Sequence, residues 1–383
     1  MHAVRTVRHD LSEKPFIVIW EVTRACQLAC HHCRATAIPD RDPSELTTAE
    51  GMVLLDQLAS YPRPRPMVVL TGGDPFERPD LAELVAHGTA RGLHMSVSPS
   101  VTPRLTEGSL AALRDAGASA VSLSLDGATP ATHDGFRGVP GVFEATLDAA
   151  RTVRQLGLRL QINTTVTRDN VEELPAILAR VALADVALWS VFLLVPTGRG
   201  RQLAPLQADD VEQVLHWLHD VATIVPVKAT EAPHFRRIAL QRRADERCST
   251  RIQVGSLRAR LTARTAELVG GAAPASRRAR PPLDVNAGRG FAFIDHHGAV
   301  FPSGFLPLAA GSVRLQPVPE IYRDSPLLRA LRDPSRLRGR CGVCDFAAVC
   351  GGSRSNAYAV AGDPFAEDPG CAYEPGRVLD EPD

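Results

Sequence analysis

A regular alternation of short apolar runs and longer helical segments, between residues 16 and 200, constrains the fold most strongly. Most of the runs are almost continuously apolar, which is typical of strands covered on both faces. Strands that alternate with helices predict a parallel sheet with right-handed crossovers. The six runs are FIVIWEV (16–22), MVVLTGG (67–73), LHMSVSP (93–99), AVSLSLD (120–126), LQINTTV (160–166) and LWSVFLLVP (188–196).

The segments between the runs suit helices. Strand–helix units that curl around one axis predict an α/β fold, a partial (β/α)6 barrel of the TIM type. In such a barrel the residues directly after the strands meet at one mouth, so the chemistry is expected there. The helical segments are residues 45–60, 79–91, 106–116, 142–156 and 170–183.

The pattern changes beyond residue 205. Residues 207–223 suit another helix, residues 228–249 hold a dense arginine cluster, and residues 258–282 have the Ala, Arg, Gly and Pro content of an exposed connector. The sequence GFAFIDHHGAVFPSG predicts a hairpin around His297 and Gly298. The predicted units are a barrel (16–225), a linker or substrate-side segment (226–284) and a smaller C-terminal domain (285–380).

The composition argues against several classes of protein. Lys plus Arg and Asp plus Glu both number 43, so a net charge of zero gives no attraction to nucleic acid or to an anionic membrane. The first residues are polar and no apolar run reaches the roughly 18 residues of a membrane span, so a cytoplasmic location is expected. In that reducing compartment metal or redox chemistry explains the eight cysteines better than disulfides do.

Three cysteines follow the first apolar run: Cys26, Cys30 and Cys33. Three thiolates on one loop suit three irons of a [4Fe–4S] cluster. His31 and His32 lie beside them, so a zinc ion held by three thiolates and one imidazole is the alternative.

Polar residues follow the other runs at the same mouth. Paired Gly72 and Gly73 let the backbone approach a ligand closely, and Asp74 can pair with an ammonium group. Each feature alone suits an ordinary turn or helix cap, but their convergence indicates a binding site. The other polar residues at strand ends are Ser98, Ser100, Ser124, Asp126, Asn163 and Thr165.

The cysteine triplet, the Gly72-Gly73-Asp74 turn, SLSLDG (122–127) and VPTGRG (195–200) together resemble the radical S-adenosylmethionine (SAM) superfamily. The resemblance covers nearly the whole chain. It implies that Cys26, Cys30 and Cys33 hold a [4Fe–4S] cluster whose fourth iron binds SAM. It further implies reductive cleavage of SAM to methionine and a 5′-deoxyadenosyl radical that takes hydrogen from a substrate, with a flavodoxin- or ferredoxin-type electron donor.

The same resemblance implies a set of SAM-binding residues. The chain departs from the superfamily at two of its motif positions: Asp74 stands where Glu is common, and His32 where Tyr or Phe is frequent. Asp74 keeps the carboxylate group, and His32 keeps a flat ring. The implied residues are Gly72, Gly73, Asp74, Ser100, Ser124, Arg137, Asn163 and Val195.

A second cysteine set, Cys341, Cys344, Cys350 and Cys371, supplies four thiolates. By itself the set suits a four-thiolate zinc site or a fully ligated [4Fe–4S] cluster. Its spacing resembles the SPASM or twitch auxiliary-cluster domains of the superfamily, which favours one auxiliary [4Fe–4S] cluster. A second auxiliary cluster is not expected, because Arg354 and Ser303 stand where such domains have cysteine.

The substrate is less constrained. WEVTRACQLACHHCRA, TGGDPFERPDL, TTVTRDN and CGGSRSNAYA resemble the haem-biosynthesis branch, which decarboxylates or removes porphyrin propionates. His234, Arg236 and Arg237, with nearby arginines, are candidates to pair with propionates, unless they form a solvated helix face. The alternatives are a maturase of a ribosomally made peptide and, from another class, a non-catalytic iron–sulfur or zinc scaffold.

Overall fold

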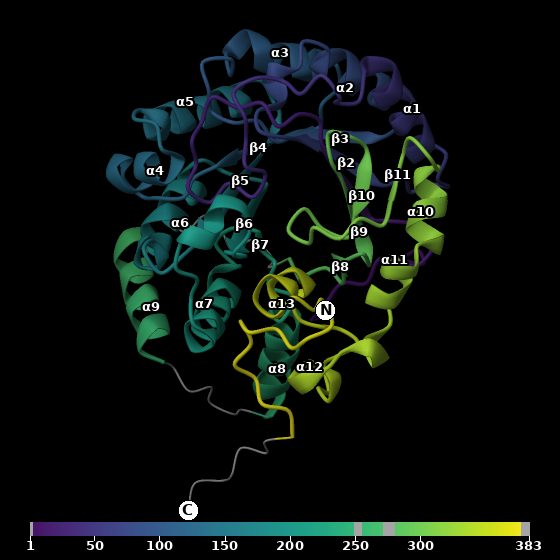
Figure 1. Cartoon of the computed structure of the whole chain (residues 1–383). Helices are drawn as coiled ribbons and strands as arrows, with labels where there is room; N and C mark the ends of the chain where they lie inside the picture. The colour runs from purple at the N-terminus through teal and green to yellow at the C-terminus, as the bar shows by residue number, and fades with distance from the viewer. Residues whose placement is uncertain (1–2, 249–254, 271–279, 377–383) are drawn as a thin grey trace, which may run out of the picture.

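The computed structural model of the chain describes residues 3–248, 255–270 and 280–376. Its strands form one curved sheet, and helices surround its outer side (Figure 1). Seven strands stand side by side in chain order and all pair in parallel, which confirms the six predicted strands and adds a seventh. They are β1 (Ile17–Glu21), β2 (Met67–Thr71), β3 (His94–Val97), β4 (Ala120–Ser124), β5 (Arg159–Val166), β6 (Leu188–Leu193) and β7 (Val227–Thr230).

The outer helices confirm the predicted segments to within a few residues. The first of them begins with a capping box, in which Thr47 and Glu50 each accept a backbone N–H from the other, and it buries Leu54, Leu55 and Leu58. The helices are α1 (Thr48–Ala59), α2 (Leu81–Ala90), α3 (Glu107–Asp115), α4 (Pro130–Arg137), α5 (Val142–Gln155), α6 (Leu174–Leu183) and α7 (Ala208–Val221), with short 3-10 turns at Pro75–Glu77, Val171–Glu173 and Gly198–Gln202.

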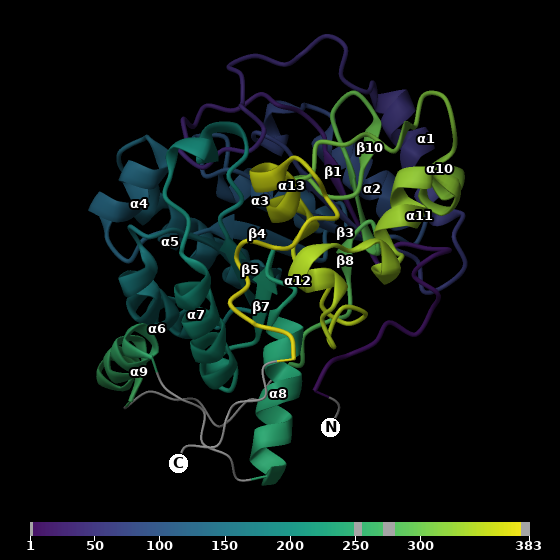
Figure 2. The same ribbon diagram turned by 60° about the horizontal axis from the view of Figure 1, so that its bottom comes forward.

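The predicted connector is wrong for most of its described length. A helix, α9 (Ser256–Val269), packs against α6 and α7 there. It buries Leu257, Leu261 and Val269, and Trp217 Nε1 donates to Thr265 Oγ1 at 3.1 Å. Residues 271–279 of that prediction lie outside the described part of the chain. The arginine cluster is helix α8 (Phe235–Cys248), which extends away from the strands in Figure 2.

The C-terminal segment continues the barrel sheet. Strand β9 (Gly290–Ile294) pairs in parallel with β1, and β10 (Ala299–Phe301) returns antiparallel to it, which confirms the hairpin predicted at His297 and Gly298. The sheet thus runs from β11 at one end to β7 at the other, and the barrel is partial, as predicted. The remaining elements are β8 (Asn286–Ala287), β11 (Gly311–Ser312), α10 (Val318–Asp324), α11 (Pro326–Leu331), a 3-10 turn (Pro334–Arg336), α12 (Gly339–Gly342) and α13 (Arg354–Ala361).

The loop before α13 bridges the open side of the barrel. Ser353 Oγ donates to Glu231 just after β7, at 2.7 Å, and Asn286 Nδ2 of β8 donates to Gly352 O at 3.1 Å. In Figure 1 α13 accordingly lies between the two ends of the strand arc. None of the helices within the described residues is both long and apolar enough to cross a bilayer.

Candidate active site

A cavity of about 650 Å³ occupies the inside of the barrel. Its volume falls within the usual range of ligand pockets, about 300–1,000 Å³. At the carboxyl ends of the strands it is lined by the three N-terminal cysteines and by all but one of the residues implied in SAM binding. Those lining residues are Gly72, Gly73, Ser100, Ser124, Arg137, Asn163 and Val195, whereas Asp74 is not among them.

The loop that carries Cys26, Cys30 and Cys33 (the cysteine loop, or cluster loop) begins where β1 ends. Hydrogen bonds hold its first part. Leu28 N donates to Cys26 Sγ at 3.4 Å, and Ser100 Oγ lies 3.6 Å from the same sulfur. Burial raises the pKa of the Cys26 thiol. A thiol in such a place ionises fully only beside a positive charge, so the site suits an iron cluster that lowers this cost.

A positive charge lies beside the second cysteine. Arg137 Nη1 donates to Cys30 Sγ at 3.7 Å, while its Nη2 pairs with the buried Asp126. Burial opposes ionisation of Asp126, but Arg137 holds the pKa of that carboxyl below its usual value. Next to them His32 stacks on Phe136 with ring centroids 4.5 Å apart, and burial lowers its pKa to about 3, so the ring is neutral at pH 7.

The paired glycines are required by a close approach to the cysteine loop. A Cβ on Gly72 would lie 2.5 Å from Thr23 O, and one on Gly73 would collide with the carbonyl oxygen of Ala25. Gly73 N and Asp74 N donate to those same two carbonyls, at 2.9 and 2.7 Å. The Gly-Gly-Asp turn therefore anchors the start of the cluster loop by its backbone.

The Asp74 carboxylate does not line the cavity. It is fully buried, accepts a hydrogen bond from Thr102 Oγ1 at 2.7 Å, and caps the 3-10 turn Pro75–Glu77 through Phe76 N. The shorter side chain thus acts within the protein, and the backbone of Gly72 and Gly73 is the part of the motif that faces the cavity.

The VPTGRG motif holds the end of the cluster loop. Arg199 N donates to Cys33 O at 3.0 Å, and Arg199 Nε donates to Cys30 O at 2.8 Å. Gly198 has a φ of 54°, and a Cβ there would lie 2.5 Å from Cys33 O. The motif therefore positions two of the three cysteines through their carbonyl groups.

The opposite end of the cavity is basic. His94 and Arg159 are the first residues of β3 and β5, and Lys228 lies in β7. From Arg159 to Asn163 the strand rises by about 13 Å, which separates this end from the cysteines. Arg5 and Arg280 complete the basic end, which sequence reasoning missed because these residues belong to strand beginnings and to distant segments.

Glu231 is an acidic residue in the cavity wall and was also missed. Ser303 and Ser353 donate to its two carboxylate oxygens at 2.9 and 2.7 Å. Burial raises the pKa of the Glu231 carboxyl, and its φ of 55° is unusual for a residue with a side chain. The raised pKa favours the protonated carboxyl, and that form can donate a proton to a bound ligand.

The C-terminal cysteines gather around the predicted substrate arginines. Arg236 Nη2 donates to Cys350 O at 2.9 Å, and its Nη1 donates to the carbonyls of Leu283 and Val285. Arg237 pairs with Glu212 and lies over the Tyr373 ring at 4.9 Å. Burial raises the pKa of the Cys350 thiol to about 12, and Arg236 acts against this rise. Arg236 lines the cavity, but Arg237 and His234 do not.

These contacts exclude a solvated helix face, since Arg236 and Arg237 are 3% and 2% exposed. His234 is buried beside Asp368, with Nδ1 3.6 Å from the carboxylate. Arg354, which stands in place of a cysteine, donates to Pro364 O and Ala366 O at 2.9 and 2.7 Å and to Cys341 Sγ at 3.6 Å. Two of the residues predicted to meet substrate, Arg236 and Arg237, therefore lie beside cysteines of the second set.

Comparisons with known proteins agree with this geometry. The Radical SAM superfamily model matches residues 20–181. The fold is that of Streptococcus suis SuiB bound to S-adenosylmethionine, at a TM-score of 0.68, 14% identity and coverage of 94% of this chain and 78% of the other. The chain belongs to the radical SAM superfamily and is an enzyme of that class, which excludes the scaffold interpretation.

Within the superfamily the chain is similar to three relatives over almost its full length. It is 37% identical to the AdoMet-dependent heme synthase of Methanosarcina barkeri, covering 96% of this chain and 99% of the relative. It is 39% identical to the enzyme of the same name from Nitratidesulfovibrio vulgaris, covering 98% and 97%. Identity to the PqqA peptide cyclase of Rhodopseudomonas palustris is 31%, covering 94% and 88%.

Proposed function

We propose that this enzyme oxidatively decarboxylates propionate side chains of a haem- or porphyrin-type substrate in the cytoplasm. The observation that carries the proposal is the basic end of the barrel cavity, formed by Arg5, His94, Arg159, Lys228 and Arg280. Arginine and lysine side chains bind carboxylates well, and arginine does so in bidentate fashion. The similarity to AdoMet-dependent heme synthases supports the same substrate class.

The residues at the other end fit a [4Fe–4S] cluster and SAM. Cys26, Cys30 and Cys33 offer three soft sulfur ligands, and Arg137 offsets the charge of one of them. When bound, the cluster and SAM together supply a 5′-deoxyadenosyl radical that removes one hydrogen atom from the substrate. Gly72, Gly73, Ser100, Ser124, Asn163 and Val195 are the residues that would orient SAM in the cavity.

The proposed reaction converts a propionate side chain to a vinyl group in two steps. Loss of a hydrogen atom from the propionate carbon attached to the ring leaves a substrate radical. Cleavage of the bond to the carboxylate then releases CO2 and one electron and leaves a vinyl group. The basic end of the cavity would hold the propionates that do not react, so that one propionate at a time points toward the cysteines.

The released electron needs an acceptor, for which we propose one auxiliary [4Fe–4S] cluster on Cys341, Cys344, Cys350 and Cys371. Arg236 supports this role, since it contacts Cys350 on one side and lines the cavity on the other. Buried guanidinium groups beside thiolates favour a negatively charged cluster. The electron that begins each turnover would come from a flavodoxin- or ferredoxin-type donor.

The test is anaerobic turnover of the reconstituted enzyme with SAM, a reductant and coproporphyrin, with and without iron. We expect 5′-deoxyadenosine to form with a porphyrin that has lost CO2 and two hydrogen atoms. Arg159→Ala should raise KM for the porphyrin about tenfold or more, since a charge-assisted contact is worth about 1.5–3 kcal/mol. Arg154→Ala, an exposed arginine paired with Asp185, is the matched control.

The peptide maturase remains the second candidate because of the similarity to PqqA peptide cyclase. If 5′-deoxyadenosine forms at the same slow rate with and without porphyrin, and no porphyrin is consumed at any iron loading, the proposed substrate class is wrong. Unchanged porphyrin KM in Arg159→Ala would reject the basic end of the cavity as the propionate site.

A further inference from the structure

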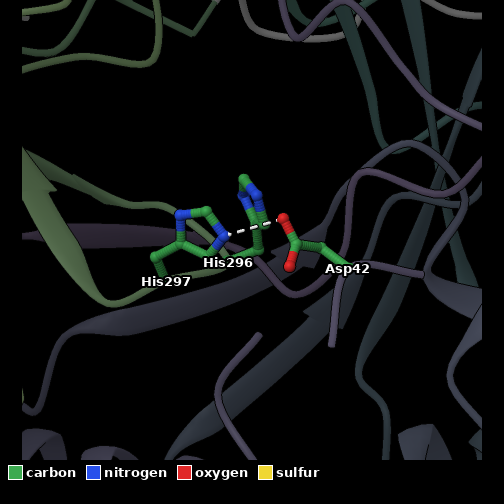
Figure 3. Close-up of side chains that lie close together, drawn as sticks. All are labelled: Asp42, His296 and His297. Atoms are coloured by element: carbon green, nitrogen blue, oxygen red, sulfur yellow. Dashed lines mark hydrogen bonds and ion pairs between the residues drawn. The ribbon is translucent and has the colours of Figure 1, made fainter. Parts of the chain in front are cut away.

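Three side chains that the proposed reaction does not use lie together at the β9–β10 turn: Asp42, His296 and His297 (Figure 3). Each offers one ligand atom, and these atoms lie within 4.8 Å of one another. His297 Nε2 is 3.1 Å from Asp42 Oδ2, and the two imidazole rings have centroids 3.9 Å apart.

The buried imidazole has a nitrogen without a partner. His296 is 4% exposed, and its Nε2 makes no hydrogen bond within the described part of the chain. Its other nitrogen, Nδ1, lies 2.9 Å from Glu21 Oε1. Because a carboxylate accepts from Nδ1–H, the lone pair stays on Nε2, which is then available to a metal ion. A buried nitrogen acceptor costs free energy when it is left unpaired.

Neighbouring residues fix the position of His296 and of the loop that carries Asp42. Glu21 is itself paired with Arg34 at 2.7 Å, and its side chain is 4% exposed. Leu46 N donates to His296 O at 2.7 Å, which ties the Asp42 loop to the β9–β10 turn. Carboxylates that orient a ligating histidine through its second nitrogen are the usual support of metal sites.

We propose that Asp42, His296 and His297 bind a divalent first-row transition ion such as Zn²⁺ or Fe²⁺. Two imidazoles and one carboxylate form a recurrent donor set for these ions. At metal–ligand distances of about 2.0–2.1 Å tetrahedral ligand atoms lie about 3.3 Å apart, close to the 3.1 Å between His297 Nε2 and Asp42 Oδ2. The ion would replace the hydrogen bonds of His297 Nε2 with Asp42 and with Ser44 Oγ. The side chains of His297 and Asp42 are 41% and 30% exposed, so the remaining position faces solvent and takes water.

The site differs in chemistry from both cysteine sets because it has no sulfur donor. It also lies directly behind the cluster loop, since Glu21 ends β1 and Arg34 follows Cys33. Binding of the ion would fix the Glu21–Arg34 pair and the loop that carries Asp42.

The test uses the enzyme with its cysteine sites already loaded with iron and sulfide, and Zn²⁺ as the probe. Anaerobic equilibrium dialysis should give one equivalent of zinc per chain. Absorption spectroscopy at the zinc edge should give nitrogen and oxygen neighbours at about 2.0–2.1 Å and no sulfur near 2.3 Å. Both His296→Ala and His297→Ala should weaken zinc binding at least 100-fold. Glu21→Gln should weaken it about 10–100-fold, as expected for loss of a supporting carboxylate.

The control is His87→Ala, which removes a histidine paired with Asp56 at 2.8 Å but far from a third ligand group. This variant should bind zinc as the wild type does. His297 is half exposed, so its variant keeps the test valid if the buried His296→Ala fails to fold. Zinc with sulfur neighbours only, no bound equivalent, or one retained in His297→Ala would overturn the proposal.

Discussion

Replacing Arg137 with Met removes the positive charge that faces Asp126 and Cys30. The Asp126 side chain is 1% exposed, and Arg137 is its charged partner in the ion pair. Removal of one partner from a buried pair costs about 3–5 kcal/mol, because the other charge stays buried without compensation. Thr165 N still donates to Asp126 Oδ1 at 2.7 Å, so we expect the lower end, about 3 kcal/mol.

The loss should depend on pH in a defined direction. In the wild type burial acts against Asp126, but Arg137 holds the folded-state pKa below the unfolded value of about 3.9. The contribution of the pair is therefore present above about pH 4 and lost as pH falls through the depressed pKa. In Arg137→Met burial, the largest influence on Asp126, is opposed mainly by the Thr165 N–H hydrogen bond, so the folded-state pKa rises and the stability of the variant falls as pH rises from the unfolded-state pKa toward neutrality.

The assay is the urea midpoint measured anaerobically by tryptophan fluorescence, at about pH 5.5 and pH 8. Trp20, Trp189 and Trp217 are fully buried and report unfolding of the barrel. The gap between wild type and Arg137→Met should widen at the higher pH. Arg137→Met with Asp126→Asn should recover at least half of the loss, since no buried charge remains unpaired.

An exposed ion pair provides the control for the buried one. Arg154→Met removes an arginine from an exposed pair with Asp185 and should cost less than about 1 kcal/mol at either pH. A gap of equal size at both pH values, or a double variant as unstable as the single one, would refute the assignment of the loss to an unpaired Asp126.

Three further outcomes are expected. Cys30→Ala should abolish 5′-deoxyadenosine formation and lower iron content from about eight to about four per chain, because the C-terminal set keeps its cluster; iron near four in the wild type would contradict the auxiliary cluster. Gly73→Ala should reduce cluster loading at the N-terminal site, since its Cβ collides with the cluster loop, and iron analysis together with circular dichroism separates this from unfolding. Glu231→Gln should change the free energy of unfolding, measured in urea, by less than about 1 kcal/mol near pH 4, close to the unfolded-state pKa of Glu. Because burial raises the folded-state pKa of Glu231, wild-type stability should fall relative to the variant as pH rises from the unfolded-state pKa of about 4.3 to the raised folded-state pKa, and parallel pH curves would contradict this.

Much of the fold follows from local sequence patterns. The barrel strands are predictable because each is a nearly continuous apolar run, which only a doubly covered parallel strand requires. The cysteine loop and the glycine turn are equally local, and their residues meet as predicted in one cavity. Strand β7 was not predicted because Lys228 and Thr230 interrupt its apolar character. Helix α9 was predicted as a connector because the Ala and Arg content of the segment hid the helical spacing of Leu257, Leu261 and Val269.

Long-range pairing could not be derived in this way. Arg236 satisfies carbonyl groups 47 and 114 residues away, and no local pattern distinguishes such an arginine from one that binds substrate. The same holds for His296, which meets a carboxylate 275 residues away. The predicted hairpin is present, but its pattern did not show that His296 is buried while His297 is half exposed. Asp74 was expected to face a ligand, but its side chain caps the 3-10 turn Pro75–Glu77 and burial raises the pKa of its carboxyl.

The pairing of β9 with β1 has a consequence for synthesis of the chain. Ile17 pairs with Phe291, so this edge of the first strand has no neighbour until more than three quarters of the protein has left the ribosome. An unpaired edge is a template for association with other chains. A nascent chain that stalls before residue 290 therefore presents an aggregation-prone edge directly before the three cysteines. We expect truncation ahead of β9 to give insoluble protein even though every residue that we propose to bind SAM is present, and cluster insertion to be safest after release of the complete chain.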